Sequence, residues 1–199
     1  MTPDHVIIDA AAQDLLFRAA RTPRTFAAEP VGEDRIAALY DLIKWGPTSF
    51  NQQPLRVALV RSAEAMGRLL PLMRAGNRVK TASAPLTAIL AADLDFHEDL
   101  PDLPLGRPNA RHIFADAGPR AESAVLNATL QIGYFILGVR ALGLAAAPKT
   151  GFDAEKVSHE FFPDGGHRAL VVVGIGKPGP GAWADRSPRL PYDRVFTSH

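Results

Sequence analysis

The stretch Gly46-Pro47-Thr48-Ser49-Phe50-Asn51-Gln52-Gln53-Pro54 is the most informative part of this chain. An amphipathic pattern over residues 33–45 precedes it, and the β-forming run 55–60 follows it. A helix and a strand are therefore expected to hold it on either side. Proline lacks an amide donor and restricts the residue before it, so Pro47 is expected to end the helix.

The loop itself is polar and uncharged, with two hydroxyls and three carboxamides. Side chains of this kind suit a flat, neutral ligand that offers many acceptors, such as a flavin ring with its ribityl chain. A plain helix-to-strand turn, rich in turn-forming residues, accounts for the segment alone slightly better. Both interpretations stay open at this point.

The gross composition excludes several classes of function. The 199 residues are enough for one domain, expected to span 1–199, and the net charge of +1 gives no case for nucleic acid. The chain has no cysteine, so disulfides, thiolate metal sites and cysteine nucleophiles are excluded. The apolar run 130–139 is too short to span a bilayer, and the N-terminus resembles no secretion signal, so a cytoplasmic protein without a membrane partner is expected.

Two further patterns carry little weight. The six histidines show no metal-ligand spacing, so no metal site is expected. Residues 174–179 match the letters of a dinucleotide-binding motif, G-x-G-x-x-G. That mechanism needs a helix directly after the glycines, and Pro178 and Pro180 oppose one there. The match is interpreted as the end of a strand.

Periodicity and turn residues predict an α+β fold rather than a doubly wound one, because helices and strands alternate irregularly. The run 120–142 is apolar almost all round, which predicts a helix in the middle of the fold. Residues 94–119 are expected to be loop-rich, with one short helix at most. The predicted helices are 9–20, 33–45, 63–73, 120–142 and 153–161, and the predicted strands are 55–60, 86–92 and 169–175.

Two more segments are candidates for binding. A basic turn, Arg21-Thr22-Pro23-Arg24, and the tail arginines Arg186 and Arg189 could converge on one phosphate, although solvated surface charge explains each alone. In Pro148-Lys149-Thr150-Gly151-Phe152-Asp153, free amides near Gly151 would face a ligand above the turn. The simpler interpretation of that segment is a helix cap.

Taken in order, these segments resemble the nitroreductase family of FMN-dependent oxidoreductases. The resemblance covers residues 16–195 and includes the arginine turn, the loop 47–54, the stretch 130–148, the turn 151–153 and Arg189-Leu190-Pro191. Within the family, Lys44-Trp45-Gly46, Gly76-Asn77 and residues 84–89 look most like the malonic semialdehyde reductases of pyrimidine degradation. Thr150 and Ser187 depart from the glutamate and lysine of many members and agree with this subgroup.

The resemblance implies a central antiparallel or mixed sheet packed on buried helices, in a domain-swapped homodimer with FMN at the interface. Arg21 and Arg189 would hold the phosphate, Arg24 would lie near the pyrimidine edge, and the amide of Gly151 would face flavin N5. Pro47, Thr48, Ser49 and Asn51 would reach the flavin from the other subunit. The full set of cofactor-binding residues that it implies is Arg21, Thr22, Arg24, Pro47, Thr48, Ser49, Asn51, Asn127, Pro148, Thr150, Gly151 and Arg189.

The implied reaction is reduction of malonic semialdehyde to 3-hydroxypropionate, with NADH or NADPH as cosubstrate. Arg107 or Arg111 is the candidate partner for the substrate carboxylate, with a solvated surface role as the alternative. A broad nitro, quinone or enal reductase using the same FMN site is the nearest alternative function. A flavin-binding or flavin-storage protein is the alternative from another class.

Overall fold

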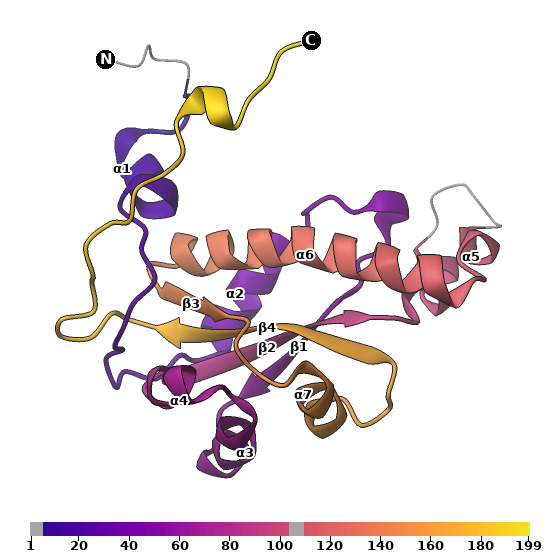
Figure 1. The fold of residues 1–199 in the computed structure, drawn as a ribbon, viewed down its shortest axis with the longest axis horizontal. Helices are drawn as coiled ribbons and strands as arrows, with labels where there is room; N and C mark the ends of the chain where they lie inside the picture. The colour runs from indigo at the N-terminus through magenta and orange to yellow at the C-terminus, as the bar shows by residue number, and fades with distance from the viewer. Residues whose placement is uncertain (1–5, 104–109) are drawn as a thin grey trace.

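The computed structural model describes residues 6–103 and 110–199. Its centre is a four-stranded sheet in the order β1-β2-β4-β3, and every neighbouring pair is antiparallel (Figure 1). The strands are β1 (Leu55–Val60), β2 (Leu86–Asp93), β3 (Ala145–Lys149) and β4 (His167–Gly176). The prediction of an α+β fold built on an antiparallel sheet is therefore confirmed.

Helices cover both faces of this sheet (Figure 1). α2 (Glu33–Ile43) and α6 (Ala117–Ala141) lie on one face, and α3 (Ala63–Leu69), α4 (Ala75–Ala82) and α7 (Ala154–Phe161) lie on the other. Two short helices, α1 (Ala10–Gln13) and α5 (Ala110–Ile113), lie outside these layers. The polypeptide thus forms three layers, with the sheet in the middle.

The core lies on both sides of β2, which is buried along its whole length. Its even-numbered residues, such as Leu86 and Leu90, pack with Phe135 and Val139 of α6. Its odd-numbered Ile89 packs on the other face, in the cluster under α3 and α7. Because alternate residues of a strand face opposite sides, one continuous apolar run can serve both clusters.

The central helix α6 is buried on one side only, which differs from the prediction that it lies in the middle of the fold. Its outer side exposes Leu126, Leu130 and Tyr134, because nothing in the described parts of this chain covers that side. By length and composition α6 is also the one helix of the described residues that could cross a membrane, a test that core helices pass as well. Its inner side packs on the sheet.

Two glycines of this region behave as expected. A Cβ on Gly138 would lie 2.5 Å from Ile43 and 2.6 Å from Leu39, so the absence of a side chain allows α2 to approach α6 closely. Gly143 has a φ of +70° just after the helix, as a left-handed cap requires. The chain then turns directly into β3.

Several predicted boundaries were wrong. The helix predicted over 63–73 ends at Leu69, and α4 and β3 were not predicted at all. Residues 94–119 contain two short 3₁₀ turns, Phe96–Glu98 and Leu100–Asp102, in addition to α5 and the start of α6. The rejection of the dinucleotide motif is confirmed, since β4 ends at Gly176 and no helix follows it.

The two ends of the chain run side by side away from the sheet (Figure 1). Asp9 caps α1 through its carboxylate, which accepts from the amide of Ala12 at 2.7 Å, and a short π-helical turn over 14–18 follows. The tail after β4 was predicted to be extended, but it first turns at residues 180–181, where the amide of Ala182 donates to the Gly179 carbonyl, and it is extended only from there to a last turn at Tyr192–Arg194. We call residues 6–20 and 183–196 the terminal arm.

Candidate functional site

The loop 46–54 has a strained backbone. Phe50, Asn51 and Gln53 all have φ between 44° and 53°, the left-handed region that side chains disfavour. Each such residue costs about 1–2 kcal/mol, so the surrounding contacts must hold the loop in this shape. Strain of this kind is concentrated at functional sites, which agrees with the importance that the sequence gives to this stretch.

Three polar side chains of α6, spaced four residues apart, hold the loop. Asn127 accepts a hydrogen bond from the amide of Ser49 at 2.7 Å, and Ser123 accepts one from the Gln52 carboxamide at 2.9 Å. Gln131 accepts from the first amide of β1 at 2.9 Å. Asn127 is only 3% exposed and Gln52 1% exposed, so these bonds form away from water. Residues four apart lie on one side of a helix, which makes this a continuous polar stripe.

The predicted binding residues of the loop are accessible to solvent, because α6 holds the loop from its inner side. Pro47 and Ser49 are exposed, and Thr48 and Asn51 are partly exposed. The carboxamide of Asn127 is different, since its oxygen holds Ser49 and its nitrogen donates to the Ser123 carbonyl at 2.9 Å. In this structure Asn127 positions the loop, and contact with a flavin stays a prediction.

The basic turn and the C-terminal tail lie against each other, as the sequence suggested they could. Arg21 donates to the carbonyl of Ala184 at 3.0 Å, and the amide of Arg24 donates to the carbonyl of Ala182 at 2.8 Å. Thr22 is exposed beside them. Arg189 instead donates to the carbonyls of its neighbours Ser187 and Pro188, at 2.9 and 3.2 Å.

The turn after β3 leaves one backbone donor free. The carbonyl of Gly151 accepts from the amide of Arg74 and from the side chain of Asn77, both at 3.0 Å. Within residues 6–103 and 110–199, the amide of Gly151 meets no acceptor. A Cβ on Gly151 would overlap the Asn77 carboxamide nitrogen, so any larger residue would displace the Asn77 side chain that bonds to this turn. Pro148 is partly buried in β3 and Thr150 is exposed.

Sequence reasoning missed one site residue that the structure makes prominent, Lys149. It is the last residue of β3 and only 9% exposed. Its ammonium donates to the Ala147 carbonyl at 3.0 Å, and in the described part of the chain it forms no ion pair. Burial, together with the positive charge of Lys80, lowers the pKa of Lys149 from 10.5 to about 8. A lysine that ends a run of buried alanines was the signal that could have revealed it.

Asn77 and Lys80 were also missed as site residues, because they belong to α4, which was not predicted. They lie close to Gly151 and Lys149 respectively. The two candidate substrate arginines differ in what can be said of them. Arg107 lies outside the described residues, and Arg111 pairs with Glu98 while remaining half exposed.

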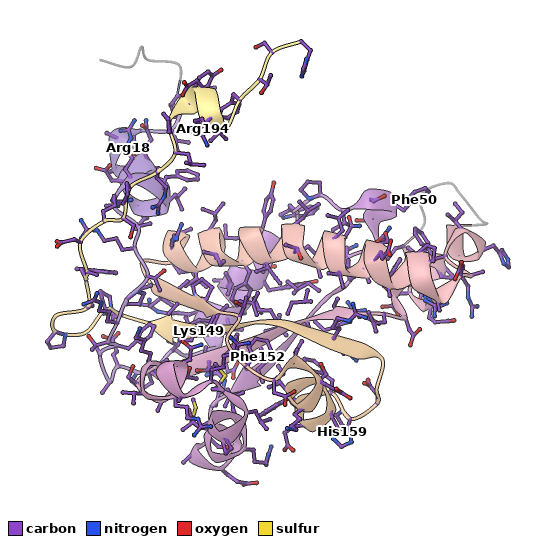
Figure 2. The ribbon with its side chains drawn as sticks, viewed as in Figure 1. Arg18, Phe50, Lys149, Phe152, His159 and Arg194 are labelled. Carbon is purple, nitrogen blue, oxygen red and sulfur yellow. The ribbon has the colours of Figure 1, made fainter. Side chains whose placement is uncertain are left out.

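The predicted site residues fall into two groups within one subunit. Figure 2 shows Phe50 near one end of α6, whereas Arg18 lies beyond the other end, with Lys149 below the helix.

A cavity of about 500 Å³ borders the loop and is lined by Gln52, Gln53, Arg56, Asp99 and Gln131, among others. Arg56 in its wall is neutralised by Asp93 at 2.7 Å and Asp99 at 2.5 Å. A cavity of about 180 Å³ includes Arg21, Arg140 and Trp183.

Comparison with protein families decides the wider relationship. The model of the nitroreductase family matches residues 17–177, which is most of the chain. The chain belongs to the nitroreductase family. The match begins in the terminal arm and contains both groups of site residues except Arg189.

Named relatives agree with this assignment. A Streptomyces griseus protein with the provisional name NADH dehydrogenase/NAD(P)H nitroreductase is 58% identical over 194 residues, which cover 97% of this chain and 98% of that protein. A Streptomyces coelicolor protein of the same provisional name is 57% identical over the same coverage.

Solved structures confirm the nitroreductase fold. A provisionally named nitroreductase from Exiguobacterium sibiricum, solved in complex with FMN, has a TM-score of 0.85 at 17% identity, covering 94% of this chain and 96% of that one. The Bacillus subtilis nitroreductase YdfN, also provisionally named, has a TM-score of 0.83 at 20% identity and covers 96% and 100%.

The hydrogen bond from Ser49 to Asn127 yields a first prediction for this nitroreductase. Replacing Asn127 by alanine leaves the partly buried amide of Ser49 without this acceptor, which costs about 1 kcal/mol. We expect amide hydrogen exchange over residues 48–53 to accelerate. The control is Thr129→Ala, on the outer side of the same helix, where the hydroxyl bonds only to the helix backbone. Unchanged exchange in Asn127→Ala would show that the loop holds its shape without this bond.

The buried ammonium of Lys149 yields a second prediction. Between pH 8 and pH 10.5 the unfolded chain binds more protons at this lysine than the folded chain does, so this group makes stability rise with pH there. Below pH 8 the full penalty of about 3 kcal/mol applies. Lys149→Met should therefore stabilise the ligand-free protein by about 1–3 kcal/mol at pH 7, and by much less at pH 10.

Urea unfolding at the two pH values measures this difference. Lys156→Met is the matched control, because Lys156 is exposed on α7 and paired with Asp153 at 2.9 Å. Changes at such positions usually stay within about 0.5 kcal/mol. A Lys149→Met protein less stable than the wild type at pH 7 would contradict the proposed cost of burying this charge.

Proposed function

We propose that this chain is an FMN-dependent oxidoreductase that takes its electrons from NADH or NADPH. The observation that carries the proposal is the turn after β3, where, among residues 6–103 and 110–199, the amide of Gly151 meets no acceptor and the buried ammonium of Lys149 meets no anion. A backbone donor and a cation at one place suit an electron-rich ring. The FMN found in the structural neighbour from Exiguobacterium sibiricum and the names of the relatives support the same assignment.

The residues of the chain fit this cofactor in type and number. Arginine guanidinium groups bind phosphate well, and Arg21, Arg24 and Arg189 lie on the two segments that run together. Thr22 adds an exposed hydroxyl beside them. The loop 46–54 offers the uncharged donors and acceptors of Thr48, Ser49 and Asn51. These groups would hold and orient the cofactor, which when bound supplies the hydride chemistry that protein side chains lack.

A homodimer explains why the two groups of site residues lie apart. Leu126, Leu130 and Tyr134 leave an apolar stripe exposed on α6, and a patch of this kind on a folded subunit indicates a protein interface. The terminal arm projects from the subunit and exposes Ile7, Phe17 and Tyr192 as well. A second copy covering the stripe would bring its loop 46–54 toward the arginine turn of the first.

Two substrate classes remain for the oxidative half of the reaction. The short segments that resemble malonic semialdehyde reductases, together with Thr150 and Ser187, favour an aldehyde acid that is reduced to 3-hydroxypropionate. The provisional names of the relatives, NADH dehydrogenase/NAD(P)H nitroreductase, favour reduction of nitro compounds, which belongs to the broad alternative. Arg111 could meet a carboxylate only by leaving Glu98, with which it forms an exposed ion pair.

Anaerobic kinetics with the purified protein tests the function. We expect a yellow protein whose flavin absorbance bleaches rapidly on mixing with NADH or NADPH. Turnover of malonic semialdehyde is then compared with turnover of nitrofurans and quinones under the same conditions. Higher kcat/KM for the aldehyde supports the narrow function, and the reverse order supports the broad one. A colourless protein that binds no FMN rejects both, and slow bleaching indicates a flavin-storage protein.

The apolar stripe of α6 gives a separate prediction. Leu130→Glu places a carboxylate in the proposed interface, so it should convert the dimer to a monomer and lower FMN affinity at least tenfold. Ala154→Glu adds the same charge on α7, at the other face of the sheet, and should change neither property. Light scattering and FMN titration measure the two quantities. A wild-type protein that is monomeric while it binds FMN tightly would refute the shared site.

A further inference from the structure

Lys149 lies on the face of the sheet that α3, α4 and α7 cover. Alternate residues of a strand share a face, and Ala147 packs there with Phe26 and Ala84. The lysine side chain therefore points to the same layer, where its ammonium reaches the Ala147 carbonyl. Gly174 lies directly opposite Ala147 in β4, and Ala84 and Phe26 occupy the space that its side chain would need, since a Cβ there would lie 3.1 to 3.3 Å from them.

The charge of this ammonium is not neutralised by the chain. No carboxylate of the described residues forms an ion pair with it, and the charged group that acts on it most is another cation, Lys80. A buried charge without a counter-ion is expensive, so proteins keep one mainly where a ligand supplies the opposite charge. One carbonyl accounts for one of its three donors, and the other two are available.

The position along the chain indicates which anion is involved. Lys149 lies two residues before Gly151, whose amide meets no acceptor in the described residues and is the donor that the resemblance places at flavin N5. Arg21 and Arg189, the arginines proposed for the phosphate, are on other segments. The charge on which Lys149 would act is the one that appears on the ring, as for Arg24, which the resemblance places near the pyrimidine edge. A hydride from NADH or NADPH brings two electrons and one proton, so the ring gains one negative charge and the nicotinamide becomes a cation.

We propose that the Lys149 ammonium stabilises the negative charge of the reduced flavin ring, and that this lysine thereby sets how readily the cofactor accepts hydride. The inference rests on the proposed function, because it needs FMN at this turn. Lys149 would therefore bind the reduced cofactor more strongly than the oxidised one. A difference between these two affinities changes the reduction potential of the bound FMN.

The test compares the affinities of oxidised and reduced FMN in three proteins, the wild type, Lys149→Met and the control Lys156→Met. We expect Lys149→Met to bind reduced FMN at least tenfold more weakly while its affinity for oxidised FMN changes less than threefold. For a two-electron couple each tenfold change lowers the potential by about 30 mV, which anaerobic spectroelectrochemistry measures independently. Lys156→Met should match the wild type in both.

Each other outcome has a distinct meaning. If Lys149→Met weakens both forms equally, the lysine acts on the phosphate or on the fold, and the inference is overturned. If neither affinity changes, it is overturned as well, while the proposed function stands because the wild type still binds FMN. If the wild type binds no FMN, the proposed function fails and takes the inference with it. A second variant, Lys149→Gln, repeats the comparison with a polar, neutral side chain.

Discussion

The hydrogen bond between the Ser49 amide and the Asn127 carboxamide is the constraint on which the shape of the candidate site depends. The loop that it holds contains three residues with positive φ, and their combined cost of about 3–6 kcal/mol must be offset locally. Buried hydrogen bonds from one stripe of α6 provide that compensation. Removing Asn127 would leave the partly buried amide of Ser49 without its acceptor.

This constraint explains why α6 carries polar residues along one part of its inner side and apolar residues along the other. Toward its N-terminal half, Ser123, Asn127 and Gln131 face the loop, and toward its C-terminal half, Phe135 and Val139 face the sheet. One helix therefore positions the loop and covers the core. A purely apolar inner face would have packed equally well, but it would have left the backbone of the loop without donors and acceptors.

Much of the fold could be predicted from the sequence because periodicity is strong where elements are long. The patterns over 33–45, 86–92 and 120–142 correspond to α2, β2 and α6, and the loop between Gly46 and Pro54 was recognised by its residues. β3 was missed because Ala-Ala-Ala-Pro-Lys has neither β-branched residues nor alternation, and its pairing with β4 is set by the tertiary structure. α4 was missed because it is short and mostly exposed. Lys149 and Asn77 were not predicted as site residues because they belong to β3 and α4.

The length of α6 separates the two groups of predicted site residues within one subunit. Asn127, which holds the loop, and Arg140, which donates to the Leu16 carbonyl of the terminal arm at 3.1 Å, are 13 positions apart. At 1.5 Å per residue, this separation is about 20 Å along the helix axis. The stripe of exposed apolar residues begins beside the first of these points, at Leu126, and continues between them with Leu130 and Tyr134. In the proposed homodimer, a two-fold axis through that stripe would exchange the two ends of the helix, so the loop of each copy would meet the arginine turn of the other. The same surface that buries the apolar stripe would then assemble the site, which makes cofactor binding and association parts of one equilibrium.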